Sequence, residues 1–220
     1  MNIDPQSLDI ADRYKLLIGS IVPRPIAVVS TVSPAGAPNL APFSFFNAIG
    51  SNPMCVMFCP ANGPAGEEKD TLRNAKPVGE GGTGAFVINW AVESIIRKVV
   101  GAAEPRPYGD NEFDLVDLTE LPSAVVAPPR VAESPIAFEC RTMQVVRTNP
   151  GQPMGGNIVI GEVVHIVVDD DLINERFHID QERLRAVGRM GGRSYCRTRE
   201  RFELSPGTPA LTAPSTFEVR

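Results

Sequence analysis

Residues 22–54 read VPRPIAVVSTVSPAGAPNLAPFSFFNAIGSNPM, and this stretch indicates the class of fold. Its first part, residues 25–32, is rich in β-branched side chains and is typical of a strand. The turn-forming cluster Ser33–Gly36 comes next, and a second extended run follows it. Two extended runs around such a turn predict a β-hairpin.

Apolar runs between turns predict further strands along the chain. These runs cover residues 54–61, 85–90, 137–148, 157–170 and a short last one near Arg201–Leu204. Three segments have helical patterns, namely 11–20, 67–75 and 91–103. Residues 104–135 are rich in proline and acidic residues, and we expect an irregular excursion over the surface. Because the 19 glycines and 21 prolines disfavour a helical bundle, we expect a small β-barrel with helical covers.

Composition and charge argue against several classes of protein. A chain of 220 residues fits one domain, or at most two small ones, and its net charge of −5 argues against a nucleic-acid-coating protein. No stretch approaches the roughly 18 apolar residues that a membrane span needs. The first residues (MNIDPQSLDIADRY) are polar and acidic, unlike a signal peptide, and the four cysteines are scattered. We therefore expect a cytoplasmic location and free thiols, with Cys55 and Cys59 packed in the core and no metal site.

One glycine-rich segment matches the letters of a nucleotide-binding motif. Gly79–Gly84 fits G-x-G-x-x-G, but a dinucleotide fingerprint needs a strand before it and a helix after it. Here a short helix and Lys76-Pro77 come before the segment and a strand-like run follows, so we expect a loop. With two histidines, the chain is also poorly supplied for a hydrolase triad or a catalytic zinc site.

A set of fragments distributed along the chain carries a family resemblance. After residues 22–54 come KDTLRNA (69–75), FVIN (86–89), FEC (138–140), NIVIGEVVHIVVDD (157–170) and VGRMGGRSY (187–195). In this order the set resembles the flavin reductase-like family, whose fold is an FMN-binding split barrel. The resemblance implies a mainly β fold, a split β-barrel of Greek-key type with a few short covering helices, over residues 10–204. Residues 205–220 would then form a C-terminal tail.

The same resemblance implies an FMN-dependent oxidoreductase. Electrons would come from NADH or NADPH by hydride transfer to flavin N5, and flavin or a small acceptor would be reduced. The protein would supply orientation and electrostatics, so no side chain is assigned as catalytic. The family also implies a homodimer with FMN near the subunit interface, a small-molecule substrate, and no nucleic-acid or membrane partner. Two other classes stay open, a non-catalytic FMN-binding electron-transfer module and a flavin-dependent oxidase or oxygenase.

The candidate FMN site follows from the matched segments. Lys69 and Thr71 open a short helix, where a positive charge, a hydroxyl and free backbone N–H groups suit a phosphate. The segment Ser44–Ala48 corresponds to the part of similar proteins that wraps the flavin ring. The full set of candidate cofactor-binding residues is Arg24, Ser30, Thr31, Ser44, Phe45, Phe46, Asn47, Ala48, Lys69, Thr71, Arg189 and Tyr195.

Several members of this set have a second interpretation. Ser30 and Thr31 either face the flavin or are ordinary sheet residues. Arg24 lies between two prolines and either binds a phosphate or carboxylate or acts as a structural clamp. Arg189 and Tyr195 bracket a glycine pair, in a loop that either closes over a flavin of the neighbouring subunit or lies on the surface.

Two further positions bear on the reaction. Many flavin reductases of this type carry an Asp-His pair ahead of the strand that corresponds to residues 157–168, and here Gly155-Gly156 takes that place. The resemblance therefore supports flavin binding more directly than nicotinamide-dependent reduction. His165 falls in an otherwise apolar strand, and we expect a core or interface histidine there.

Overall fold

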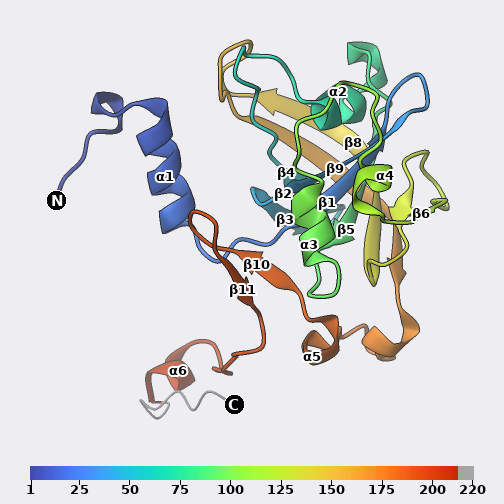
Figure 1. Ribbon diagram of the computed structural model, residues 1–220. Coiled ribbons are helices and arrows are strands. Elements are labelled where there is room, and N and C mark those ends of the chain that lie inside the picture. The colour runs from blue at the N-terminus through green and yellow to red at the C-terminus, as the bar shows by residue number, and fades with distance from the viewer. Residues whose placement is uncertain (213–220) are drawn as a thin grey trace.

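Seven antiparallel strands form the main sheet of the computed structural model, which describes residues 1–212 (Figure 1). Their order across the sheet is β2 (Pro38–Phe43), β1 (Ala27–Val32), β5 (Ala85–Trp90), β8 (Ile136–Arg147), β9 (Asn157–Val168), β4 (Met54–Phe58) and β3 (Phe46–Ser51). The predicted hairpin is β1–β2, with Ser30 opposite Leu40. The two longest strands, β8 and β9, have 12 residues each and pair with one another.

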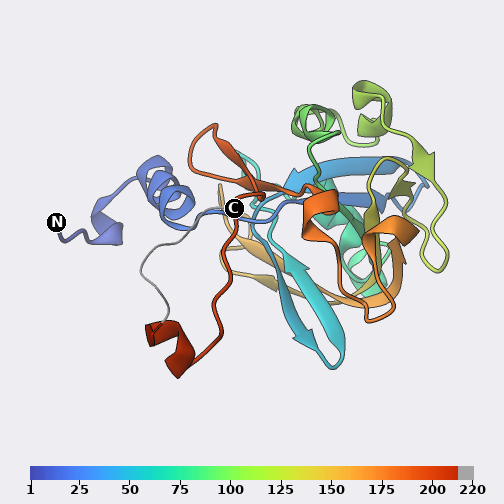
Figure 2. The same ribbon diagram turned by 90° about the horizontal axis from the view of Figure 1, so that it is seen from below.

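Short helices and two small ribbons complete the described chain. The helices are η1 (Pro5–Ser7), α1 (Ile10–Ser20), α2 (Asp70–Ala75), η2 (Val78–Glu80), α3 (Ile96–Gly101), α4 (Glu112–Val116), η3 (Asp170–Leu172), α5 (Gln181–Leu184) and α6 (Thr208–Thr212). The ribbons pair β6 (Glu120–Leu121) with β7 (Arg130–Val131), and β10 (Val187–Arg189) with β11 (Tyr195–Arg197). Both views show α1 and α6 standing to one side of the barrel (Figures 1 and 2). Among the helices of residues 1–212, none has the length and apolar character needed to cross a membrane.

Aromatic and aliphatic side chains fill the curved sheet. Phe58 and Phe86 are fully buried, and their ring centroids lie 5.0 Å apart. Gly161 on β9 makes room for them, because a Cβ at this position would lie 2.4 Å from the Phe86 ring. Cys55 is buried and Cys59 is half-buried, and both are free thiols. A second buried cluster packs the outer face of the sheet against α3 and α4.

The helix predicted over residues 91–103 is shorter in the structure. It begins at Ile96, since the chain before it pairs with the segment that leads into β10. The Ala91 carbonyl accepts a hydrogen bond from Val187 N at 3.0 Å, which holds this part of the chain extended. Tertiary pairing therefore overrides the helical pattern of the apolar residues.

The prediction of a last strand near Arg201–Leu204 is wrong. The last strand of the described chain is β11, which ends at Arg197 and pairs with β10 around the turn at Gly191-Gly192. Arg201 instead donates to the Thr198 carbonyl at 3.3 Å and pairs with Glu182 at 2.8 Å.

Residues 104–135, predicted to be irregular, contain the helix α4 and the β6–β7 ribbon. Buried polar side chains of the sheet hold this segment over the barrel. They are Ser30, which donates to the Pro129 carbonyl; Asn89, which accepts from Val131 N; and Glu139, which accepts from Ala124 N and Val125 N. The excursion is therefore tied to the core and is part of the domain.

Candidate functional site

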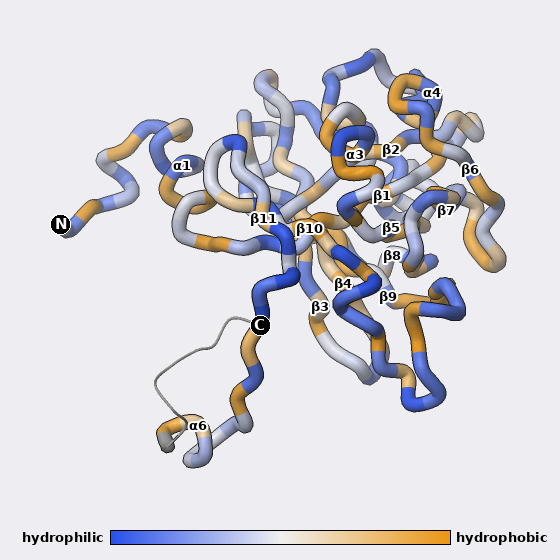
Figure 3. The backbone as a smooth tube through the Cα atoms, turned by 60° about the horizontal axis from the view of Figure 1, so that its bottom comes forward, coloured by the Kyte–Doolittle hydropathy of each residue, from blue (hydrophilic) through white to orange (hydrophobic). Residues whose placement is uncertain are grey.

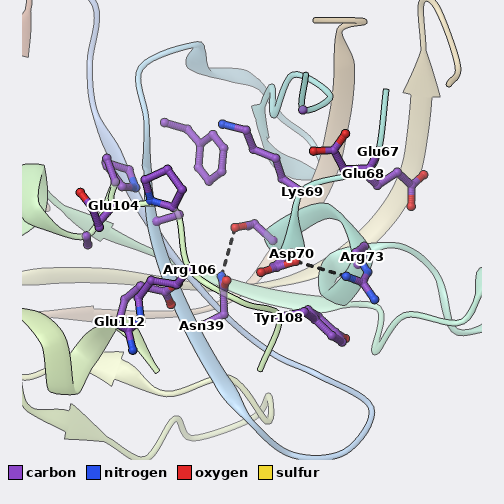
Figure 4. Close-up of a pocket in the computed structure, with 18 of the residues that line it drawn as sticks. Asn39, Glu67, Glu68, Lys69, Asp70, Arg73, Glu104, Arg106, Tyr108 and Glu112 are labelled. Atoms are coloured by element: carbon purple, nitrogen blue, oxygen red, sulfur yellow. Dashed lines mark hydrogen bonds and ion pairs between the residues drawn. The ribbon is translucent and has the colours of Figure 1, made fainter. Parts of the chain in front are cut away.

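An open pocket of about 720 Å³ lies between β2, the loop before α2, the start of α2 and the segment that follows α3 (Figure 4). Two of the candidate residues, Lys69 and Thr71, line it. Its lining also includes Asn39, Pro42 and Phe43 of β2, Glu67, Glu68, Asp70, Arg73 and Lys76 around α2, and Arg106, Tyr108 and Glu112 of residues 104–135, called the middle segment below.

The start of α2 is shaped by Lys69. This residue is the N-cap with extended backbone (φ −65°, ψ 154°), and no side chain of the described residues caps the helix there. The predicted helix over residues 67–75 therefore starts three residues late, and the freed residues form the loop that presents Lys69. Its side chain projects into the pocket beside a phenyl ring (Figure 4).

A buried polar network orients the Thr71 hydroxyl. Asn39 Nδ2 donates to Thr71 Oγ1 and to Thr31 Oγ1, both at 3.1 Å. Asn74 Nδ2 also donates to Thr31 Oγ1 at 3.1 Å, and Tyr108 Oη donates to Asn74 Oδ1 at 2.9 Å. Thr71 Oγ1 accepts from Asn39 and donates to no acceptor among residues 1–212, so its proton can be donated to a ligand in the pocket.

The pocket contains four cations, and three of them are paired with carboxylates. The pairs are Arg73 with Asp70 at 3.4 Å, Lys76 with Glu68 at 2.8 Å, and Arg106 with Asp110 at 2.8 Å. The Lys69 ammonium forms no hydrogen bond or ion pair with any side chain or carbonyl of residues 1–212. Lys69 is thus the cation of this pocket that is available to an anionic ligand.

Two carboxyl groups in the pocket are easier to protonate than usual. Burial raises the pKa of Asp70, although Arg73 opposes the shift. Burial also raises the pKa of Glu112, whose Oε2 accepts a hydrogen bond from Leu40 N at 2.9 Å. As the pH falls, these groups lose their negative charge earlier than ordinary carboxyls do. An anion in the pocket then meets less repulsion.

The middle segment forms one wall of the pocket. The centroid of the Tyr108 ring lies 3.5 Å from the Arg73 guanidinium carbon, and the Tyr108 hydroxyl donates to Asn74 Oδ1. Glu112 fastens the same segment to β2 through Leu40 N. Sequence patterns did not single out Asn39, Tyr108 or Glu112, because each reaches the pocket through tertiary contacts. Only Asn39 carries a local signal, as a polar residue opposite Thr31 in the predicted hairpin.

A second group of candidate residues surrounds Arg24, which is 4% exposed. Its guanidinium donates to the Ile18 carbonyl at 2.7 Å, the Ile21 carbonyl at 2.5 Å and the Met190 carbonyl at 3.1 Å. Its Nε donates to Ser44 Oγ at 3.3 Å, and the Phe45 ring centroid lies 5.8 Å from its Cζ. The contacts of Arg24 are those of a clamp that joins the end of α1, the β10–β11 turn and the barrel.

Arg189 and Tyr195 lie beside this clamp. The backbones of Arg24 and Arg189 exchange hydrogen bonds of 2.9 and 2.8 Å. The Arg189 guanidinium lies 4.4 Å from the centroid of the Tyr195 ring and donates to the Gly192 carbonyl at 2.6 Å. Burial, and then the charge of Arg189, lower the pKa of Arg24 from its ordinary value. None of these residues lines the pocket around Lys69.

The remaining candidates lie in three different environments. Ser30 and Thr31 are fully buried in β1 and are occupied by contacts within the sheet and the middle segment. Phe46 packs with its ring edge-on to Trp90, at a centroid distance of 6.3 Å. Asn47 and Ala48 are exposed on β3.

The sequence profile of the flavin reductase like domain matches residues 18–188. This chain belongs to that family. The match runs from the end of α1 into β10 and includes the residues that line the pocket around Lys69 and Arg24 itself, but not its partner Met190.

Solved structures agree with the family and the fold. Nitrilotriacetate monooxygenase component B from Bacillus cereus is 34% identical with a TM-score of 0.86, covering 93% of this chain and 98% of that protein. A 2-nitrobenzoate 2-nitroreductase from Pseudomonas fluorescens is 29% identical with a TM-score of 0.81, covering 98% and 99%. A split-barrel protein from Shewanella frigidimarina (TM-score 0.78, 20% identity, covering 94% and 100%) confirms the predicted fold.

Packing accounts for the glycine pair in this flavin reductase-like chain. A Cβ at Gly155 would lie 2.3 Å from the Asn149 carbonyl oxygen and 2.9 Å from Asn62 Nδ2, so a larger residue does not fit the present turn. His165 is half-buried on β9, opposite Glu139 in the strand register. In the isolated chain it is therefore not a fully buried core residue.

Proposed function

We propose that this chain is an FMN-dependent oxidoreductase that uses NADH or NADPH to reduce flavin or a small acceptor. The observation that carries the proposal is the unpaired Lys69 ammonium beside the Thr71 hydroxyl, in a pocket of a flavin reductase-like chain. A phosphomonoester needs a cation and hydroxyl or N–H donors, and both are present here. When bound, FMN supplies a ring nitrogen that accepts hydride and returns electrons to an acceptor.

The residues of the chain would bind and orient that cofactor. Lys69 would pair with the phosphate, and Thr71 would donate its hydroxyl proton to a phosphate oxygen. Asn39 would fix the direction of the Thr71 proton through its own hydrogen bond of 3.1 Å. Pro42 and Phe43 give the same pocket an apolar side suited to the less polar part of the flavin.

Replacing Lys69 by alanine tests the phosphate site. We expect the dissociation constant for FMN to rise about 10- to 100-fold, because a charge-assisted contact is lost, and that for riboflavin to change less than about threefold. Quenching of flavin fluorescence measures both values. Lys15→Ala, on α1 and outside the pocket, is the control. Equal losses for the two flavins would reject the phosphate role of Lys69.

Anaerobic mixing tests the reaction. The FMN-loaded protein should lose the visible absorbance of oxidised flavin when NADH or NADPH is added. A flavin that stays oxidised with both donors, but is reduced by a protein donor, would favour the electron-transfer module instead. Similarity over nearly the whole chain to a 2-nitrobenzoate 2-nitroreductase favours a nitroaromatic acid as one acceptor to try. Reoxidation of the reduced flavin by 2-nitrobenzoate without oxygen would support that choice.

The proposed functional unit is a homodimer. The helix α1 stands apart from the barrel (Figure 3), and of its 11 residues only Ile18 is buried. Tyr14, Leu16 and Leu17 are 43–50% exposed, although a helix this short is unstable without packing partners. An apolar groove of about 770 Å³ on the barrel, lined in part by Trp90, is also open. A second copy would cover both surfaces and bring its 189–195 loop toward the flavin.

Replacing Leu17 by aspartate tests the dimer. Light scattering should give twice the chain mass of 23.7 kDa for the wild type and the mass of one chain for the variant. The variant should be monomeric because dimerisation would bury the aspartate charge at the interface. We also expect weaker FMN binding by the variant, since the partner would contribute to the site. Lys15→Ala, on an exposed side of α1, is the control. A wild-type protein that is monomeric by light scattering and still binds FMN would contradict the proposal.

A further inference from the structure

Lys69 is unpaired although it lies among acidic neighbours in the sequence. Residues 67–70 read Glu-Glu-Lys-Asp, so three carboxylates adjoin the one ammonium group. Figure 4 shows the Lys69 amine and the carboxylate of Glu68 pointing to different sides. Opposite charges this close along the chain attract one another, so the contacts that each carboxylate makes elsewhere bear on whether it pairs with Lys69.

Each neighbouring carboxylate is engaged elsewhere. Glu67 Oε2 accepts a hydrogen bond from Ala65 N at 2.9 Å, and Asp70 pairs with Arg73. Glu68 has the strongest set of contacts, with Lys76 Nζ at 2.8 Å from one oxygen and Arg147 at 2.9 Å from the other. Glu68 is therefore held from two elements at once, the end of α2 and the strand β8.

Arg147 lies outside the pocket but is coupled to its lining. Its side chain is 24% exposed on β8, and it also donates to Glu80 Oε2 at 2.6 Å. Glu80 belongs to η2, within the glycine-rich segment 79–84 that resembles a nucleotide motif. This segment thus contributes a counter-ion for Arg147.

The charges of this network persist at neutral pH. Burial pushes the pKa of Glu68 upward, but the hydrogen bonds from Lys76 and Arg147 outweigh it and lower the pKa overall. Although burial alone would lower it, the pKa of Arg147 is raised by its bonds to Glu80 and Glu68. A permanent anion therefore sits one residue away from Lys69. Without Arg147, the Glu68 carboxylate would keep only its contact with Lys76, and its second oxygen would be open to compete for the Lys69 ammonium.

We propose that Arg147 is a positioning residue, which holds the Glu68 carboxylate away from Lys69 and so keeps the Lys69 ammonium available to the flavin phosphate. This inference rests on the proposed function. Arg147 itself touches neither the pocket nor, in this arrangement, the cofactor. Its effect on Lys69 would pass through Glu68, and not through its second partner Glu80.

Four variants and two flavins test the competition. We expect Arg147→Met to weaken FMN binding about tenfold and riboflavin binding by less than about twofold, because only the phosphate contact is affected. The double variant Glu68→Gln with Arg147→Met should regain wild-type FMN affinity within about twofold, since a neutral amide does not compete for Lys69. The double variant Glu80→Gln with Arg147→Met also removes one negative charge, but it leaves the Glu68 carboxylate ionised and without Arg147. Its FMN affinity should therefore stay as low as that of Arg147→Met. Arg141→Met removes an exposed arginine from the same strand and should have no effect.

Three outcomes would overturn the proposal. They are an unchanged FMN affinity in Arg147→Met, an equal loss for FMN and riboflavin, and equal rescue by the Glu68 and Glu80 double variants. An equal loss for FMN and riboflavin would show a structural role for Arg147, which thermal unfolding of the variant would also detect. Equal rescue by the two double variants would show a long-range effect of charge. Lys69→Ala, measured in parallel, separates this proposal from the phosphate site. If Lys69→Ala weakens FMN binding more than riboflavin binding and Arg147→Met does not, the proposed role of Arg147 is wrong and the phosphate site at Lys69 stands.

Discussion

Glu139→Ala is expected to lower the free energy of unfolding by about 3–5 kcal/mol. Glu139 is 0% exposed, and its two oxygens each accept a backbone N–H at 2.8 Å, from Ala124 and Val125. Alanine would leave these two donors without an acceptor and would open a cavity in the core. Arg130, whose Nε lies 4.0 Å from Glu139 Oε1, would lose its nearby countercharge. The loss should appear as a lower denaturation midpoint in urea.

The conservative change at the same position separates the hydrogen bonds from the volume. Glu139→Gln keeps the shape but replaces one acceptor by a donor, and we expect a loss of about 1–3 kcal/mol. Glu162→Gln, exposed on β9, should change the stability by less than about 0.5 kcal/mol. A loss of less than about 0.5 kcal/mol for Glu139→Ala would mean that the Glu139 carboxylate does not hold the middle segment. Faster hydrogen exchange at Ala124 and Val125 should accompany the predicted loss.

Arg24→Met is the second change with a large expected effect. We expect a loss of about 3 kcal/mol in the free energy of unfolding, since four hydrogen-bond acceptors lose a buried donor together. Three of these acceptors are the carbonyls of Ile18, Ile21 and Met190, which belong to two elements that stand apart from the barrel. Both elements should loosen, so proteases should cut within α1 and the β10–β11 turn faster than in the wild type.

Two controls make the result at Arg24 specific. Arg13→Met, exposed on α1, should leave stability and proteolysis unchanged. Arg24→Lys keeps the charge but cannot reproduce the fork of donors, so it should recover less than half of the lost stability. Full recovery by lysine would show that charge, and not the geometry of the clamp, is what this position requires.

The strands were predictable because their signals are local. Alternating or continuous β-branched runs between turns identify β1, β4, β5, β8 and β9 with small errors at their ends. The helix predicted over residues 91–103 begins late because a distant segment of the chain pairs with its first residues. Ala91 pairs with Val187, nearly a hundred positions away, and this pairing removes the first turn of a helix that its own sequence favours.

The candidate site divides in the same way. Lys69 and Thr71 were identifiable, because a short segment contains both the cation and the hydroxyl and lies where a helix begins. Arg24, Ser44, Arg189 and Tyr195 had no such relation in the sequence, and the structure gathers them around a clamp away from the pocket lining.

By itself, the sequence determined the strands, the hairpin and the acidic segment that contains Lys69, since each depends on neighbours within a few residues. Only the tertiary structure decided which charges stay unpaired. Glu68 meets Arg147 because the long β8–β9 pair brings the end of β8 beside the loop before α2. Electrostatic pairing depends on distance in space, and that distance is set by how the barrel closes.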